Sequence, residues 1–93
     1  MARVKFFGTL RMLLKLKETS IEIENNTTIR EFLEKLQNKI EGKFIDKLID
    51  QNGNIIPGTI ILVNKKNIFH LNLLDTTVNN DDEVVIFPPG AGG

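Results

Sequence analysis

The chain has 93 residues, of which 41% are hydrophobic and 26% are charged. These fractions are typical of one soluble globular domain and exclude a disordered chain. Lys and Arg together number 12, as do Asp and Glu, and this zero net charge disfavours a nucleic-acid-binding protein. The absence of Cys excludes disulfides, Cys-ligated metals and a thiol nucleophile.

No segment of the sequence indicates export or membrane insertion. The first residues lack the basic start and apolar run of a signal peptide. No apolar run approaches the ~18 residues that a membrane-spanning helix needs. We therefore expect a cytoplasmic protein without a membrane partner.

Two alternating segments open the chain. In Ala2–Phe7, Val4 and Phe6 share one face of a predicted strand, and Ser20–Glu24 alternates in the same way. These strands predict an antiparallel hairpin. Residues 10–17 would form its connection, with room for one helical turn.

The strongest helix signal follows this hairpin. Thr28 and Glu31 fit a capping box at the start of the helix. A single apolar stripe runs along it, formed by Ile29, Phe32, Leu33, Leu36 and Ile40. Gly42 stands where a left-handed C-terminal cap is expected. Such a helix buries one face only, so it must lie on a sheet.

The second half of the chain predicts shorter elements. We expect a short second helix over 44–50, a strand over Thr59–Val63 and a short edge strand over Ile68–Leu71. Residues 73–76 predict a tight turn that packs two leucines under the sheet. Glu83–Phe87 is the final predicted strand.

This order of elements predicts an α+β domain of the β-grasp (ubiquitin-like) type, with a mixed sheet of four to five strands and one main helix packed across one face. In this topology the first and last strands would be parallel neighbours at the sheet centre, and the apolar residues on both of their faces favour a central position. The domain would span residues 1–87, followed by a flexible tail at 88–93.

The open face of this sheet predicts a docking surface. If the first and last strands are neighbours, then Phe7, Val85 and Phe87 share this face, largely exposed to water. An exposed apolar cluster of this kind is typical of an interaction site. The alternative is that residues 44–56 fold over this face as a lid.

The last six residues differ from the rest of the chain. Pro88 and Pro89 cannot extend the sheet, and Gly90, Ala91, Gly92 and Gly93 have almost no side-chain bulk. We expect a stiff spacer that points away from the domain and reaches about 20 Å. The tail would present a terminal carboxylate, which becomes reactive only after activation, typically as an acyl-adenylate.

Other candidate chemistry is weaker. His70 has no Ser or acid spaced for a triad, the acidic turn residues lack the pattern of a calcium loop, and no glycine-rich phosphate loop is present. The terminal carboxylate is therefore the most plausible reactive group on the chain.

Several strings resemble the ubiquitin-like sulfur-carrier family of MoaD and ThiS, and most closely its MoaD branch. They are Val4–Arg11, Ile61–Asn64, Leu74–Thr76 and Asp82–Pro89, followed by Ala91–Gly93. The resemblance implies a β-grasp fold. It also implies that an E1-like, ATP-dependent enzyme of the MoeB/ThiF type adenylates the terminus and that a sulfur donor converts it to a thiocarboxylate.

In the MoaD branch the tail then enters the large subunit of molybdopterin synthase, of the MoaE type. The sulfur goes to a pterin, and the chain itself acts as a carrier rather than an enzyme, with ATP used by its partner and no cofactor of its own. The resemblance makes Gly93 the reacting residue and Gly92 the residue that gives access to it. It places Phe7 and Phe87 in the docking face, and Arg11 at its rim.

Two departures from the family pattern leave room for another acceptor. Gly90 stands where a bulky aliphatic residue is more common, and Lys65-Lys66 replaces a glycine-containing turn. Two other functions remain open on the sequence. The chain could be a ubiquitin-like modifier joined through Gly93 to lysines of target proteins, or an interaction domain with an inert tail.

Overall fold

A computed structural model describes residues 1–90 of the chain. Its strands are β1 (Ala2–Phe6), β2 (Glu18–Ile21), β3 (Thr27–Thr28), β4 (Ile60–Val63), β5 (Lys66–Asn67), β6 (Thr77–Val78) and β7 (Glu83–Phe87). Its helices are α1 (Thr9–Leu14) and α2 (Ile29–Lys39), with short 3₁₀ turns η1 (Ile45–Lys47), η2 (Ile68–His70) and η3 (Leu73–Asp75). Within this part of the chain, no helix has the length and apolar character needed to cross a membrane.

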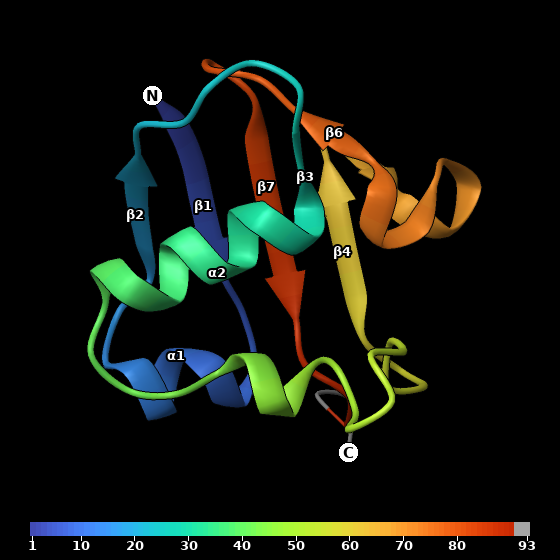
Figure 1. Cartoon of the computed structure of the whole chain (residues 1–93). Helices are drawn as coiled ribbons and strands as arrows, with labels where there is room; N and C mark the ends of the chain where they lie inside the picture. Colours follow the sequence, from blue (N-terminus) through green and yellow to red (C-terminus); the bar gives the residue numbers. More distant parts are fainter. Residues whose placement is uncertain (91–93) are drawn as a thin grey trace.

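Five strands form the main sheet in the order β2-β1-β7-β4-β5, and α2 crosses one of its faces (Figure 1). β1 and β7 are parallel neighbours, whereas the other pairs are antiparallel. The predicted β-grasp arrangement and the parallel pairing of the first and last strands are therefore confirmed. A second, two-stranded sheet of β3 and β6 was not predicted.

The core lies between α2 and the sheet. The strand residues that face α2 and the four buried residues of its apolar stripe are at most 1% exposed: Val4, Phe6, Ile61, Val84, Ile86, Ile29, Phe32, Leu33 and Leu36. Ile40, the last residue of the predicted stripe, is only half-buried because the helix has already ended at Lys39.

Residues 44–56 belong to the helix layer and do not cover the open face of the sheet. Phe44 and Leu48 are fully buried, and the Phe44 ring meets the Phe6 ring edge-on at 6.1 Å. Because Phe6 points toward α2, this contact places the segment on the α2 side. The lid alternative is wrong, and the short helix predicted over 44–50 is a single 3₁₀ turn, η1.

Other local predictions need correction. The edge strand is β5 at Lys66–Asn67, not residues 68–71, because Asn64 and Lys65 adopt positive φ and join β4 to β5 through a tight turn. The Asn67 side chain then accepts a hydrogen bond from the Phe69 amide and starts η2. The second strand of the first hairpin begins at Glu18, two residues earlier than predicted. In the turn at η3, Leu74 is buried as expected but Leu73 is 45% exposed.

The predicted cap at the start of α2 is confirmed, whereas the predicted cap at its end is wrong. At its start the predicted capping box is present: Thr28 Oγ1 accepts from the Glu31 amide at 3.2 Å, and Glu31 Oε1 accepts from the Thr28 amide at 3.2 Å. At its end, Ile40 is extended, so Gly42 is not the helix cap. Gly42 has a φ of +86° in the following turn, where its carbonyl accepts from the side-chain Nε2 of Gln37 at 2.6 Å.

Removing this cap should measurably destabilise the domain. Thr28→Ala is expected to lower the free energy of unfolding by about 1 kcal/mol at neutral pH, whereas Thr28→Ser retains the acceptor and most of the stability.

Hydrogen bonds from the Thr28 backbone and side chain lower the pKa of Glu31. A lowered folded-state pKa contributes stability above the ordinary pKa of Glu that is lost as the pH falls through the folded value. Urea unfolding of wild type and Glu31→Gln should therefore differ near pH 7 and converge in acid; a constant difference would contradict this interpretation.

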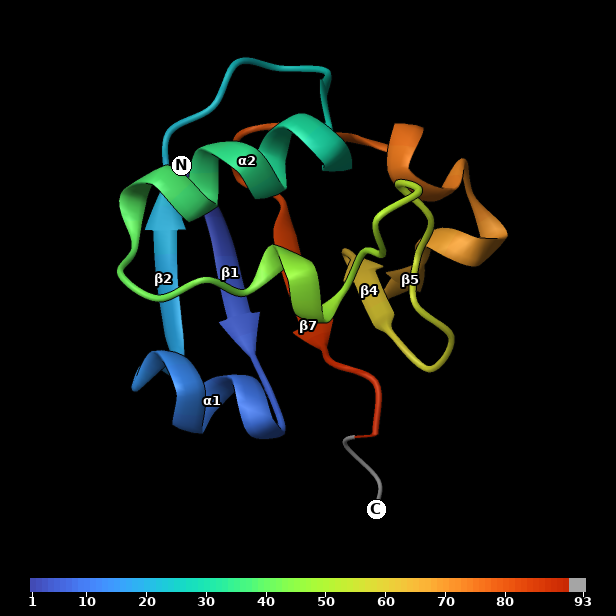
Figure 2. The ribbon, with the colours of Figure 1, turned by 60° about the horizontal axis from the view of Figure 1, so that its bottom comes forward.

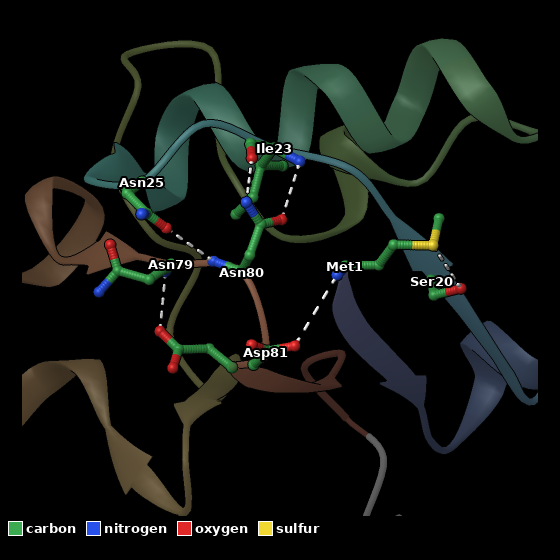
Figure 3. A network of polar contacts seen from close by, with 8 residues as sticks. Met1, Ser20, Ile23, Asn25, Asn79, Asn80 and Asp81 are labelled. Carbon is green, nitrogen blue, oxygen red and sulfur yellow. Dashed lines mark hydrogen bonds and ion pairs between the residues drawn. The ribbon is translucent and has the colours of Figure 1, made fainter.

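The loops at the end of the sheet where β1 begins are joined by asparagine side chains (Figure 3). Asn80 donates from its side chain to the Ile23 carbonyl at 2.6 Å, and its amide donates to the Asn25 side chain at 3.1 Å. The Met1 ammonium lies 4.0 Å from the Asp81 carboxylate. These contacts fix the start of β7, so the strand leaves the opposite end of the domain in a defined direction.

Candidate functional site

The open face of the sheet has a stacked aromatic pair at the end of β7. The rings of Phe7 and Phe87 are nearly parallel, with centroids 4.7 Å apart and an interplanar angle of 16°. The parallel pairing of β1 and β7 brings them together, and the Phe7 amide donates to the Ile86 carbonyl at 3.0 Å. Both side chains are half-buried, so one side of the pair remains available to a partner.

Arg11 extends this pair from α1. Its guanidinium carbon lies 4.3 Å from the centre of the Phe7 ring, and its Nε donates to the Phe6 carbonyl at 2.6 Å. A cation over an aromatic face is attracted by the ring quadrupole, so the two contacts hold Arg11 in one orientation. The structure therefore brings Arg11 and the two phenylalanines together, at the edge where the family resemblance placed Arg11.

Val85 is less accessible than predicted. It is only 8% exposed, because it lies between Lys5 of β1 and Leu62 of β4 in the sheet register. On the same face, Lys5 Nζ forms an ion pair with Glu83 at 3.3 Å. Val85 thus supports the floor of the site rather than offering a large exposed surface, and the expectation that it lies largely in water is wrong.

β4 adds two apolar residues that the sequence reasoning missed. Ile60 pairs with Phe87 and Leu62 pairs with Val85, so both lie on the open face. Ile60 is 39% exposed and Leu62 is half-buried. The signal was present in the sequence, because residues 60–63 are all apolar and a strand of this kind has apolar residues on both faces. We refer to Phe7, Phe87, Val85, Ile60 and Leu62 as the apolar patch.

The C-terminal segment begins closer to the domain than predicted. Pro88 is buried and Pro89 is half-buried, so the first two spacer residues pack against the domain instead of projecting from it. Gly58 allows this close approach, since a Cβ built there would lie 3.3 Å from the Pro89 Cβ. Gly90 is exposed with a φ of +75°. Ala91, Gly92 and Gly93 lie outside the described residues.

The remaining candidate chemistry of the described chain is limited. His70 is exposed in η2, and the segment of η2 lies away from the C-terminal end of β7 (Figure 1). Among residues 1–90, no three His, Cys, Asp or Glu side chains come together as a metal site. The geometry therefore offers an aromatic and cationic recognition surface directly before the C-terminal residues.

Comparison with known proteins agrees with this geometry. The ThiS family matches residues 4–93. Small archaeal modifier protein 3 of Haloferax volcanii is 29% identical over 90 residues, which cover 97% of this chain and 96% of the relative. A protein of Archaeoglobus fulgidus named "Putative sulfur carrier protein" is 31% identical over 84 residues, which cover 90% and 96% of the two chains.

A solved structure from Pyrococcus furiosus, named "Putative molybdopterin converting factor, subunit 1", superposes with a TM-score of 0.69 at 25% identity and 95% coverage of both chains. The fold and the site thus define a ubiquitin-like β-grasp protein. The chain belongs to the ThiS family, and the two relatives are named a small archaeal modifier protein and a "Putative sulfur carrier protein".

Proposed function

We propose that this protein carries sulfur as a thiocarboxylate on Gly93 and donates it in molybdopterin synthesis. An E1-like enzyme of the MoeB/ThiF type would adenylate Gly93, and a large subunit of the MoaE type would receive the loaded tail. Gly92 would let the terminus enter a narrow active site, because a residue without a Cβ keeps the chain thin.

The observation that best supports this proposal is the stacked pair at the end of β7. Phe87 directly precedes Pro88, so a partner bound to the rings lies at the start of the tail. Aromatic residues and Arg dominate the binding energy of many interfaces. Stacking and the Arg11 hydrogen bond hold these side chains in place before binding, which lowers the entropy lost on association.

The proposed chemistry needs only the terminal carboxylate of this chain. A carboxylate oxygen of Gly93 attacks the α-phosphorus of ATP and pyrophosphate leaves, giving an acyl-adenylate. A sulfur nucleophile of a donor then attacks the carbonyl carbon and AMP leaves. The attacking nucleophile is a persulfide, so the product is an acyl disulfide with the donor. A second thiol attacks the donor's sulfur in this disulfide, which forms a new disulfide with the donor and releases the thiocarboxylate, with one sulfur in place of one oxygen.

The pterin acceptor rests on the Pyrococcus furiosus likeness and on the resemblance to the MoaD branch. A second function has its own support, because a relative of similar length is named a small archaeal modifier protein. In that case the activated Gly93 carbonyl would be attacked by a lysine amine of a target protein and form an isopeptide bond.

Intact-mass analysis tests the proposal. The protein is incubated with ATP, a MoeB/ThiF-type enzyme and a sulfur donor, with ATP omitted as the control. We expect an ATP-dependent mass gain equal to exchange of one oxygen for one sulfur. No gain in the presence of an enzyme that thiolates its own carrier would contradict the proposal. In cell extract, peptides with lysine joined to Gly93 would instead support the modifier function.

A further inference from the structure

Helix α1 exposes apolar side chains beside the start of the tail. Met12 is 80% exposed and Leu13 is 47% exposed. Both views of the ribbon place α1 at the end of the domain where β7 runs toward the C-terminus (Figures 1 and 2). Exposed apolar side chains that are grouped rather than scattered indicate an interaction surface.

A small pocket connects α1 with the tail. Its volume is about 250 Å³, and it is lined by Thr9, Leu10, Leu13, Lys47, Pro88 and Pro89. Pockets for drug-sized ligands are roughly 300–1,000 Å³, so this one suits a single apolar side chain of a partner better than a small-molecule substrate. Because the two prolines form one wall, any occupant of the pocket touches the tail itself.

The segment that contains α1 is basic, and the first acidic residue after it is the exposed Glu18. Residues 8–17 include Arg11, Lys15 and Lys17 and no acidic residue, and none of the three forms an ion pair with another described residue. The neighbouring segment 41–50 is nearly balanced, with Lys43 and Lys47 against three acidic residues.

The loops at the opposite end of the sheet have the reverse character. Residues 22–28 and 79–82 include four acidic side chains and no Lys or Arg: Glu22, Glu24, Asp81 and Asp82. The basic residues of 8–17 thus lie at the end from which the tail leaves, and these acidic loops lie at the other end, beside the Met1 ammonium.

We infer that α1 forms a second docking surface for the enzyme that activates the tail, and that the enzyme's matching surface is apolar with an acidic border. This inference rests on the proposed function. An enzyme that shields an acyl-adenylate from water must surround the start of the tail. Arg11 joins the two surfaces, because it lies on α1 and over the Phe7 ring. The activating enzyme would thus hold the domain by the apolar patch on one side of Pro88 and by α1 on the other.

Charge reversal tests the acidic border. Lys15→Glu with Lys17→Glu, which follow α1 directly and are called the α1 pair, is compared with Lys65→Glu plus Lys66→Glu, at the end of the β4–β5 turn and the start of β5. Both pairs are exposed, both change the net charge equally, and Lys15 and Lys65 both have positive φ. The α1 pair is expected to raise the KM for the carrier about 10-fold at low salt, and the control pair less than about 2-fold.

The salt dependence of KM distinguishes a loss of electrostatic attraction to the enzyme from a loss of the fold. Raising the ionic strength from about 0.05 to 0.5 M shortens the Debye length to a few ångströms, so the effect of the α1 pair should largely disappear. If the wild type is thiolated but the two charge-reversed pairs have equal KM values, the inference is wrong. No wild-type thiolation would instead remove the proposed function.

A separate variant tests the exposed apolar side chains of α1. Met12→Ser should raise the KM several-fold without lowering the melting temperature, because the side chain is exposed. An unchanged KM would overturn this part. If sedimentation instead shows self-association of the wild type that Met12→Ser abolishes, then the surface binds a second copy and the inference is wrong.

Discussion

Phe87→Asp is expected to lower kcat/KM for activation by the partner enzyme about 100-fold, which is the range of an interface hot spot. The substitution removes one ring of the stacked pair and places a carboxylate at the centre of the apolar patch. A partner would then have to desolvate this charge without a counterion on the patch itself. Initial rates of ATP-dependent pyrophosphate release at several carrier concentrations give kcat/KM for the wild type and for the variant.

Phe69→Asp is the matched control, because Phe69 is 53% exposed and belongs to η2, a segment that lies away from the C-terminal end of β7 (Figure 1). It should change kcat/KM little. Phe87→Leu keeps apolar area but loses the stack, and an intermediate loss is expected. Circular dichroism and melting temperature monitor the fold. A folded Phe87→Asp protein that is activated normally would contradict the docking role of the patch.

Deleting Gly92 and Gly93 should abolish thiocarboxylate formation while leaving the melting temperature unchanged. The loss of two residues shortens the reach of the tail by roughly 7 Å, so the new terminus at Ala91 cannot arrive at the adenylating site. The apolar patch is intact in this variant. We therefore expect the truncated protein to inhibit activation of the wild type competitively.

Combining the truncation with Phe87→Asp should remove this inhibition, because the patch is then lost as well. Thiolation of the truncated protein at the wild-type rate would show that reach to Gly93 is not required. Full biological activity of the truncated protein would instead support an interaction domain whose tail is inert.

The sequence predicts the central architecture well because its signals there are local and strong. The Thr28–Glu31 capping box and the apolar stripe of α2 are both read from spacing within one helix. The central position of β1 and β7 agrees with their apolar residues on both faces, and their parallel direction follows from the β-grasp order of elements. The same reasoning brought Phe7 and Phe87 together on the open face.

The incorrect predictions concern residues whose burial or position is set by tertiary contacts. The burial of Val85 depends on the register that places Lys5 and Leu62 beside it, which no local pattern reveals. The side on which residues 44–56 lie depends on the contact of Phe44 with Phe6. Pro88 was expected to begin a free spacer, but it is buried, and Gly58 permits the close approach of Pro89 that follows it.

Top-down fragmentation of the thiolated protein tests the central claim most directly, because it locates the added sulfur along the chain. After incubation with ATP, the activating enzyme and a sulfur donor, the account predicts that every fragment containing Gly93 gains the mass of an oxygen-to-sulfur exchange. Fragments that end before Gly93 should be unchanged. Sulfur on any other residue, or none on Gly93 when the enzyme thiolates its own carrier, would contradict the account.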